Sequence, residues 1–330
     1  MNRYEYLRAP FEVSIDITNK CNLRCLHCYN HSGNNICSNN ELSDDEIINL
    51  VKDVVDMEPL NVCISGGEPL LKKDLVYKII TLIKSKNILI SMVSNGLLLD
   101  EETVQRLEKC GLDRIQISLD GLEAAHDKLR NKQGVFKETI KCLDLLKESK
   151  ISTFLGFVPT SWNINDFKDV VNIAIEKNSV CVRTQYIMPA GRGKKNQNYI
   201  IPTELQYRSF VHQINSIKQR IIKENLNLKI EWDDPIQHFL DVVMGENIYP
   251  QIHIKSNGNV TLTPYLPIYF GNIKETGLKS LVERGLLNGT SDKRFIEICS
   301  KINCVDDMTL NNLDLPENFI DEDIYISIGN

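Results

Sequence analysis

The sequence predicts an α/β protein: a partial (β/α)6 TIM-like barrel followed by a small α+β C-terminal module. Three observations predict it. Strand-like and helix-like segments alternate six times before residue 224. The connections are short, which favours parallel strands joined by right-handed crossovers. Glycine-rich or polar clusters also follow three consecutive strands, at the edge where parallel α/β folds carry their active sites. Six such units could also form an open doubly wound sheet, but three clusters at one rim favour the incomplete barrel.

The expected strands are short segments that are apolar or alternate between apolar and polar residues, and several stop at polar or glycine-rich loops. They are residues 11–18, 60–65, 88–94, 113–119, 151–158 and 180–187. Amphipathic segments alternate with them. The expected helices are the one that follows the capping box of residues 43–46, then 74–84, 100–110 (stopped by Gly111), 136–147, the one that Asn165 caps, and 203–223.

The pattern changes after residue 223. Residues 229–232 predict a strand and 235–244 a short helix, and 252–262 predict a hairpin around an Asn-Gly turn. Two further helices are expected at 276–287 and 292–302. The sequence therefore predicts a barrel core over residues 7–223 and an appended module over residues 224–330.

Composition excludes several classes of protein. The 330 residues include ten cysteines and carry a net charge of −6. The opening residues lack the apolar stretch of a signal peptide, and no apolar run approaches the length of a membrane span. We therefore expect a cytoplasmic protein with reduced thiols that bind metal, act in catalysis or fill the core, and no membrane or nucleic-acid partner.

Three of the cysteines form a C-x3-C-x2-C motif directly after the first strand: Cys21, Cys25 and Cys28. This spacing lets one loop wrap an iron–sulfur cluster. Such clusters usually take four cysteines, so three leave one iron open for chemistry. The alternative is a structural zinc site in a non-catalytic scaffold, with His31 or Cys37 as fourth ligand. That spacing is unusual for zinc, and zinc leaves the three loops at the sheet edge unexplained. A reactive thiol or redox pair is a third reading.

Together with residues 66–69 (Gly-Gly-Glu-Pro) after the second strand, this motif resembles the radical S-adenosylmethionine (SAM) superfamily. The resemblance implies that the three cysteines hold a [4Fe–4S] cluster whose open iron is chelated by SAM. It also implies that reduction cleaves SAM to a 5′-deoxyadenosyl radical, which abstracts hydrogen from a substrate. Gly66 and Gly67 would let backbone approach the methionyl end of the ligand, and Glu68 would accept a hydrogen bond from its ammonium.

Other residues follow from the same resemblance. His27 occupies a position that is often aromatic and lies beside the adenine; the alternative is a solvated loop histidine. Ser94 and Asn95 would touch the ribose or methionyl part, or would simply form an Asn-Gly turn.

Residues 118–121 (Ser-Leu-Asp-Gly), His126-Asp127 and Arg130 resemble a narrower group, the SPASM/twitch peptide and protein maturases. In that group the positions of Ser118 and Arg130 contact SAM, and the fork of an arginine suits a carboxylate. The alternative for Arg130 is a surface charge on a helix. Residues 188–193 also fit the group, with backbone near the adenine and Arg192 at the mouth.

The auxiliary clusters of that group need cysteines that this chain lacks. Residues 263–265 (Thr-Pro-Tyr) follow the predicted hairpin where the group usually has a cysteine. We therefore expect one cluster, with a C-terminal module that has lost its metal. Downstream only Cys299 and Cys304 remain, Cys37 is a loop thiol without an assigned role, and Cys63, Cys110, Cys142 and Cys181 are expected to be buried packing residues.

The resemblance implies a radical SAM enzyme that crosslinks, epimerises or oxidises a peptide or protein. A small molecule such as a tetrapyrrole or other cofactor precursor is the alternative substrate. The implied electron donor is a flavodoxin or ferredoxin. Because the chain reaches its cluster loop by Cys21, we expect a peptide to be recognised by the appended module or by a separate leader-binding protein. The catalytic acid or base is not identified; Tyr186, Asp233 and Asp234 are candidates.

Overall fold

The computed structural model describes residues 9–33, 40–245, 251–304, 307 and 323–328. The chain divides into two compact units, which we describe separately. Unit 1 comprises Met1–Cys21, Asn30–Ser91 and Pro235–Asn330. Unit 2 comprises Asn22–Tyr29 and Met92–Asp234.

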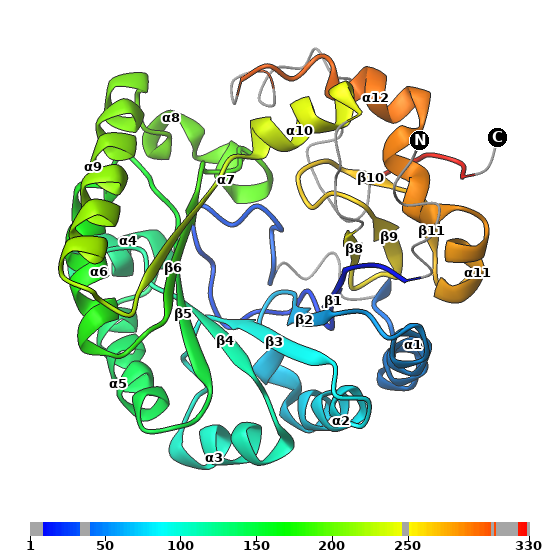
Figure 1. Cartoon of the computed structure of the whole chain (residues 1–330), viewed down its shortest axis with the longest axis horizontal. Coiled ribbons are helices and arrows are strands. Elements are labelled where there is room, and N and C mark those ends of the chain that lie inside the picture. The colour runs from blue at the N-terminus through cyan, green and yellow to red at the C-terminus, as the bar shows by residue number, and fades with distance from the viewer. Residues whose placement is uncertain (1–8, 34–39, 246–250, 305–306, 308–322, 329–330) are drawn as a thin grey trace. The chain divides into compact units, whose positions relative to one another are not determined.

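The sheet of unit 1 is centred on the first strand of the chain. Strand β1 (Glu12–Asp16) pairs in parallel with β2 (Asn61–Ser65) on one side and with β8 (Gln251–Ile254) on the other. Beyond β8 the pairing becomes antiparallel, through β9 (Asn259–Thr261) and β11 (Gly271–Asn272). Segments more than 230 residues apart in the chain therefore share one sheet (Figure 1).

The two long helices of unit 1 are α1 (Asp44–Met57) and α2 (Lys73–Lys84). A capping box starts α1: the backbone N–H of Glu46 donates to Ser43 Oγ, and that of Ser43 donates to the Glu46 carboxylate. The remaining elements are the 3₁₀ turn η2 (Pro69–Lys72), α10 (Pro235–Met244), α11 (Leu278–Glu283), the 3₁₀ turn η4 (Leu286–Ser291), α12 (Lys293–Cys299) and the parallel pair β10 (Ile268–Tyr269) and β12 (Ile324–Tyr325).

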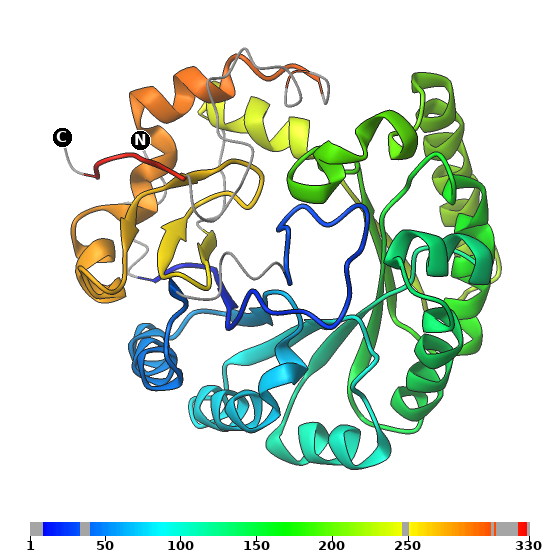
Figure 2. The same cartoon turned by 180° about the vertical axis from the view of Figure 1, so that it is seen from behind.

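Alternation along β1 and β2 separates an apolar face from a polar one. Val13, Ile15, Val62 and Ile64 are fully buried. The intervening positions are polar or half-buried, and Asp16, at the end of β1, accepts a hydrogen bond of 2.6 Å from Ser65 Oγ. Figure 2 shows α1 and α2 on one side of these strands.

A buried ion pair fastens the last described segment of unit 1. Lys255 Nζ, just after β8, lies 2.8 Å from both carboxylate oxygens of Asp323, just before β12. Asn259 Nδ2 donates to the same carboxylate at 3.0 Å. Both charged side chains are almost fully excluded from solvent. The pair therefore connects the β8–β9 turn to the far end of the chain.

Unit 2 carries four parallel strands in sequence order: β4 (Arg114–Ser118), β5 (Ser152–Phe157), β6 (Cys181–Gln185) and β7 (Lys229–Asp233). Strand β3 (Leu89–Ser94) runs from unit 1 into unit 2.

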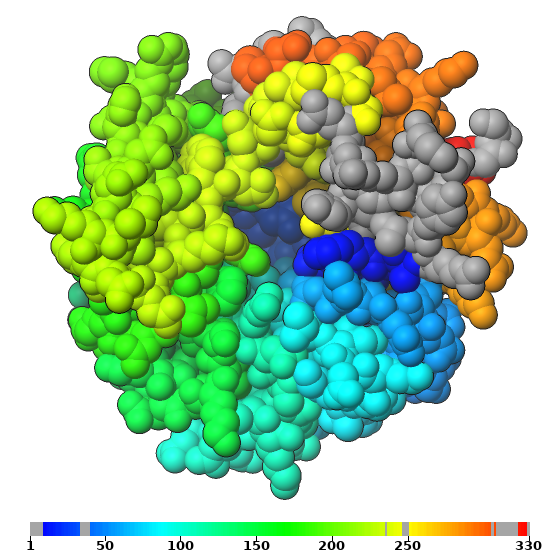
Figure 3. All heavy atoms as spheres, in the orientation of Figure 1, coloured from blue at the N-terminus to red at the C-terminus, as the bar shows by residue number. Residues whose placement is uncertain are grey.

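The helices of unit 2 cover one side of these strands, as Figures 1 and 2 show for α5, α6 and α9. Phe157 of β5, Phe167 of α6 and Phe210 of α9 pack together there, with ring centroids 4.9–6.1 Å apart. Helix α9 forms part of the surface of the unit (Figure 3). The helices are α3 (Glu101–Cys110), α4 (Glu123–Arg130), α5 (Val135–Lys147), α6 (Phe167–Glu176), α7 (Gly191–Lys195), α8 (Gln197–Ile200) and α9 (Glu204–Lys223).

All six expected strands and six expected helices are present, with ends that shift by a few residues. Two details were wrong. Asn165 is not a cap, because a 3₁₀ turn at Ile164–Asp166 precedes α6. The helix expected at 276–287 is instead a short helix α11 followed by η4. Helices α4, α7 and α8 were not expected.

The strand expected at 229–232 is confirmed as β7, and it extends the parallel strands of unit 2 through its pairing with β6. The boundary at residues 223/224 stays a prediction. No helix among the described residues is both long and apolar enough to cross a membrane.

Candidate functional site

The Gly-Gly-Glu segment of unit 1 is hydrogen-bonded to the residues that lead into the cysteine motif. The backbone N–H of Gly67 donates to Thr18 O at 2.8 Å, and that of Glu68 donates to Lys20 O at 2.9 Å. These bonds continue the β1–β2 pairing past the ends of both strands. The segment expected to bind SAM therefore also holds the chain immediately before Cys21.

This close approach explains both glycines. A Cβ at Gly66 would lie well inside contact distance of Thr18 O, and a Cβ at Gly67 would meet Lys20 O in the same way. Gly66 also has φ +130°, a backbone conformation that other residues rarely adopt. The glycines thus have a structural reason within the chain, independent of the close approach to a ligand that the sequence suggests.

Glu68 is fully buried at the start of η2. Its Oε1 accepts a hydrogen bond of 3.1 Å from Leu70 N. Its contact with the SAM ammonium stays a prediction.

In unit 2, the cysteine loop is tied to the loops that follow other strands and helices. Leu26 N donates to Leu129 O in α4 at 2.8 Å, and Asn196 Nδ2 donates to Leu26 O at 3.0 Å. Asn95 Nδ2 donates to Asn22 Oδ1 at 2.7 Å. The loop is therefore held at its start and in its middle.

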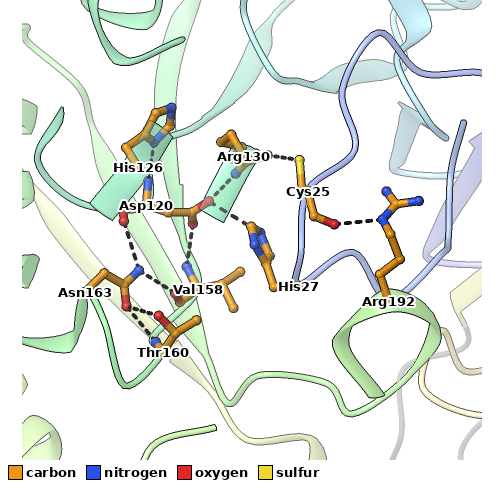
Figure 4. Close-up of polar contacts among 9 residues, drawn as sticks. All are labelled: Cys25, His27, Asp120, His126, Arg130, Val158, Thr160, Asn163 and Arg192. Carbon is orange, nitrogen blue, oxygen red and sulfur yellow. Dashed lines mark hydrogen bonds and ion pairs between the residues drawn. The ribbon is translucent and has the colours of Figure 1, made fainter. Parts of the chain in front are cut away.

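Helix α7 clamps the same loop. Arg192 Nε donates to Cys25 O at 2.8 Å, and Arg192 N donates to Cys28 O at 2.9 Å (Figure 4 shows the Nε bond). Gly191, at φ +53°, has no room for a Cβ because the carbonyl of Tyr29 lies against it. The arginine expected at the mouth of the site thus fixes the backbone of the cysteine loop.

Ser94 and Asn95 form the turn that was one of their two expected roles. Ser94 Oγ accepts from Gly96 N at 3.0 Å, and Asn95 Oδ1 accepts from Leu97 N at 3.1 Å. Asn95 also contacts the cysteine loop, because its side-chain amide donates a hydrogen bond to Asn22. Ser118 is half-buried at the end of β4. Contact of these residues with SAM stays a prediction.

Arg130 is a buried residue of α4 that joins the cysteine loop to Asp120 (Figure 4). Its Nη2 lies 2.5 Å from Asp120 Oδ2, and its Nη1 donates to Cys25 Sγ at 3.6 Å. Burial works against its charge, but Asp120 and the Cys25 sulfur raise the pKa of Arg130 above its ordinary value. The alternative of a surface charge is wrong.

Two buried histidines flank Asp120. His27 Nε2 lies 3.4 Å from Asp120 Oδ2, and His126 Nδ1 accepts from Asp120 N at 3.0 Å. Burial lowers the pKa of His27 to about 4 although Asp120 opposes the shift. Burial, with Arg130, lowers the pKa of His126 to about 4 as well. Both rings are therefore neutral at pH 7, and the alternative of a solvated loop histidine is wrong for His27.

The remaining cysteines differ in exposure. Cys142 and Cys181 are buried as expected, but Cys63 and Cys110 are only half-buried. Burial raises the pKa of Cys299 to about 12, which keeps its thiol protonated, and Cys304 is exposed. Cys37 lies outside the described residues. Among those described, no three or more His, Cys, Asp or Glu side chains are arranged to hold a single metal ion.

The donor set in and beside the cysteine loop fits an iron–sulfur cluster with a nucleoside ligand. Cys21, Cys25 and Cys28 are not joined in disulfides in the described part of the chain, and thiols are the form from which cluster ligands are made. Two polar atoms next to the loop, His27 Nδ1 and Arg130 Nε, are buried without a hydrogen-bond partner. Such atoms are rare in a folded protein and are consistent with a ligand that supplies the missing partners.

Tyr186, one of the acid or base candidates, packs in an aromatic group. Its ring centroid is 4.4 Å from that of Tyr207 and 4.9 Å from that of Trp232. Burial, followed by the nearby charge of Asp234, raises the pKa of Tyr186. Asp233 is exposed at the end of β7, and Asp234 is half-buried. No acid or base is assigned among them.

The sequence did not single out Asp120, although it lies in the Ser-Leu-Asp-Gly motif of residues 118–121. Asp120 is fully buried; its Oδ1 accepts from Val158 N at 3.0 Å, and its carbonyl accepts from Asn163 Nδ2 at 2.9 Å. The available signal was an acidic residue followed by glycine directly after a buried strand, at the edge where active-site residues gather.

Comparison with known proteins matches part of the chain to a family. Residues 15–174 match the model of the Radical SAM superfamily. The AdoMet-dependent heme synthase of Methanosarcina barkeri is 24% identical over 294 residues, which cover 83% of this chain and 82% of that protein. The sporulation killing factor maturation protein SkfB of Bacillus subtilis is 24% identical over 311 residues, which cover 93% of this chain and 72% of SkfB. Two other relatives are matched over only 45% and 59% of their length.

Among solved structures, Streptococcus suis SuiB bound to S-adenosylmethionine superposes with a TM-score of 0.71 at 19% identity, covering 86% of this chain and 68% of SuiB. At this identity the likeness shows the fold, and it confirms the partial-barrel class. The cysteine motif and the Gly-Gly-Glu segment both lie within the family match, and residues 15–174 carry a radical SAM domain.

Proposed function

We propose that the chain is a radical SAM enzyme that modifies a peptide or protein, with one [4Fe–4S] cluster held by Cys21, Cys25 and Cys28. The observation that carries the proposal is the way the cysteine loop is fastened. Asn95, Leu129, Arg192 and Asn196 all bond to it within unit 2. A loop held at so many points is preorganised to bind a cluster without rearranging.

Several residues of the chain would hold SAM. Gly66, Gly67 and Glu68 meet its methionyl end, with Glu68 on the ammonium. Ser94, Asn95, Ser118 and Arg130 meet its polar groups, and His27 lies by the adenine. The bound cluster and SAM supply the radical chemistry. The chain's own residues orient SAM, and the buried side chains around Asp120 keep water from that side of the loop.

The peptide substrate is supported by two comparisons. SkfB is a maturation protein, and SuiB has been solved with its precursor peptide SuiA bound. The electron needed to reduce the cluster would come from a protein of the flavodoxin or ferredoxin class.

A tetrapyrrole substrate is the second candidate function. It is supported by the heme synthase relative, which matches more than four fifths of both chains. Both candidates require the same cluster and SAM site, so the first experiment addresses what they share.

Anaerobic reconstitution followed by addition of dithionite and SAM tests that shared part. The wild-type chain should be brown, and mass spectrometry should detect 5′-deoxyadenosine. Cys25→Ala should lose both, whereas Cys110→Ala, a half-buried cysteine of α3, should keep both. A colourless wild-type protein that contains zinc would support the scaffold reading instead. Absence of 5′-deoxyadenosine from brown wild-type protein would contradict either enzymatic function.

The substrate class is tested next. The reduced enzyme with SAM is offered short peptides encoded beside this gene and, separately, iron-coproporphyrin. A mass change in a peptide supports the first candidate, and a mass change in the porphyrin replaces it with the second.

A further inference from the structure

Arg130 bridges a cluster ligand and a fixed carboxylate (Figure 4). One guanidinium nitrogen lies 3.6 Å from Cys25 Sγ, and another lies 2.5 Å from Asp120 Oδ2. Arg130 is 8% exposed and Asp120 is 0% exposed. Electrostatic interactions among these groups are therefore poorly screened by water.

Asp120 cannot easily turn away from this bridge. Its Oδ1 accepts from Val158 N, its own N–H donates to His126, and its carbonyl accepts from Asn163. Asn163 is itself fixed, because its Oδ1 accepts hydrogen bonds from the N–H and hydroxyl of Thr160 at 2.6 and 2.9 Å. The position of the carboxylate is thus set by two separate segments of unit 2, helix α4 and the loop of residues 158–163.

Three charged side chains lie closest to the Cys25 sulfur and its backbone. They are Arg130, which is positive and touches Cys25 Sγ, Asp120, which is negative and pairs with Arg130, and Arg192, whose Nε bonds to the backbone of Cys25. Asp120 therefore offsets much of the positive charge that Arg130 would otherwise present to the sulfur.

Charge and hydrogen bonds at ligand sulfurs are among the factors that set the potential of an iron–sulfur cluster. A cation beside a ligand sulfur stabilises the more negative, reduced state and raises the potential, and an anion lowers it. We propose that Asp120 is a positioning residue that, through Arg130, holds down the reduction potential of the cluster bound at Cys25. This inference rests on the proposed cluster, and it adds a role for Arg130 that does not require SAM to be present.

Redox titration of the reconstituted protein, followed by electron paramagnetic resonance without SAM, tests the proposal. Asp120→Asn leaves the guanidinium uncompensated and should shift the midpoint potential in the positive direction. Arg130→Gln leaves the carboxylate uncompensated and should shift it in the negative direction. The double variant buries no unpaired charge and should lie between the two single variants. Asp120→Glu keeps the charge and should stay nearer to wild type than Asp120→Asn.

Lys128→Gln is the matched control, because it removes one positive charge from the same helix. Lys128 Nζ lies 3.6 Å from the ring centroid of Trp162, and no contact joins it to Cys25 or Asp120 among those described. The midpoint potential of the cluster in Lys128→Gln should equal that of wild type. An equal shift in Lys128→Gln and Arg130→Gln would overturn the proposal, since it would reflect net charge alone.

The outcomes separate this inference from the proposed function. A wild-type chain that binds no cluster contradicts the function. A wild-type chain with a cluster, whose potential is unchanged in both Asp120→Asn and the double variant, overturns the inference and leaves the function standing. A loss of SAM binding in Arg130→Gln without any change of potential also overturns it, because Arg130 would then serve SAM alone. If Asp120→Asn or Arg130→Gln loses iron, the midpoint potentials of the double variant and of Asp120→Glu are compared with that of wild type instead.

Discussion

At the scale of single residues, the Gly67→Ala substitution tests how closely the Gly-Gly-Glu segment packs against the residues that precede the cysteine motif. A Cβ there would collide with Lys20 O, which is backbone and cannot turn aside. Gly67→Ala should therefore lower the free energy of unfolding by about 2 kcal/mol, measured by urea denaturation. Gly277→Ala is the control, since its Cβ would meet only Asp53 Oδ2 at 3.8 Å. Equal denaturation midpoints for the two variants would contradict the packing described.

His126 should make stability depend on pH. Its folded pKa is about 4, below the ordinary 6.5, so the unfolded chain binds the proton more readily. Stability should fall as pH drops from about 6.5 to about 4, by on the order of 3 kcal/mol from this residue, and should change little from this cause above pH 7. Urea denaturation at several pH values measures the slope.

His126→Asn removes the titrating ring and keeps an acceptor for Asp120 N, so its stability should fall less steeply over that range. His212→Gln replaces an exposed histidine and should leave the slope as in wild type. Identical slopes for His126→Asn and wild type would show that His126 is not the neutral buried group described.

At the scale of elements, Asp127 joins α4 to the first turn of α5. Its Oδ2 accepts from Gly134 N at 2.6 Å and its Oδ1 from Phe136 N at 2.8 Å. Asp127→Ala leaves two N–H groups at the start of a helix without an acceptor and should cost about 2 kcal/mol. Asp144→Ala, which removes an exposed partner of Lys177, should cost less than about 1 kcal/mol. Thermal unfolding of both variants measures the difference, and similar losses would refute the capping role.

The strands were predictable because alternation of apolar residues is a local property, as in Val13, Ile15, Val62 and Ile64. Helix α4 was not, because no side chain caps its start and its buried face includes His126, Asp127 and Arg130. The buried face of α4 therefore lacks the apolar periodicity from which a helix is predicted. The parallel pairing of β8 with β1 was also beyond the sequence, since no local pattern encodes a partner so far along the chain.

The residues of the candidate site also fall into those that could be predicted from the sequence and those that could not. The three cysteines and the Gly-Gly-Glu segment could be proposed from the sequence because the chemistry expected of them depends on residue type and short spacing. The partners of Asp120 were not, because His27 lies 93 residues earlier and Val158 lies 38 residues later. Only the tertiary fold brings such residues together.

At the scale of the whole molecule, we expect one cluster. Cys299 is buried in α12 with a pKa of about 12, and Cys304 is the remaining downstream cysteine. Anaerobic reconstitution should therefore give about four irons per chain. The Cys299→Ala, Cys304→Ala double variant should bind as much iron as wild type. Eight or more irons, or a loss in the double variant, would contradict a single cluster.

The ion pair between Lys255 and Asp323 has a practical consequence for altering the ends of the chain. A tag joined after residue 328 leaves the pair intact, because Asp323 stays in place beside β12. A chain shortened to end before Asp323 would instead remove the carboxylate that pairs with the buried ammonium of Lys255. Lys255 lies at the β8–β9 turn, and β8 pairs with β1. Asp323 thus helps to support β8, the strand that pairs with β1, and β1 leads to the cysteine motif. We therefore expect that removing the last described residues would weaken the support of that motif from the opposite end of the sequence.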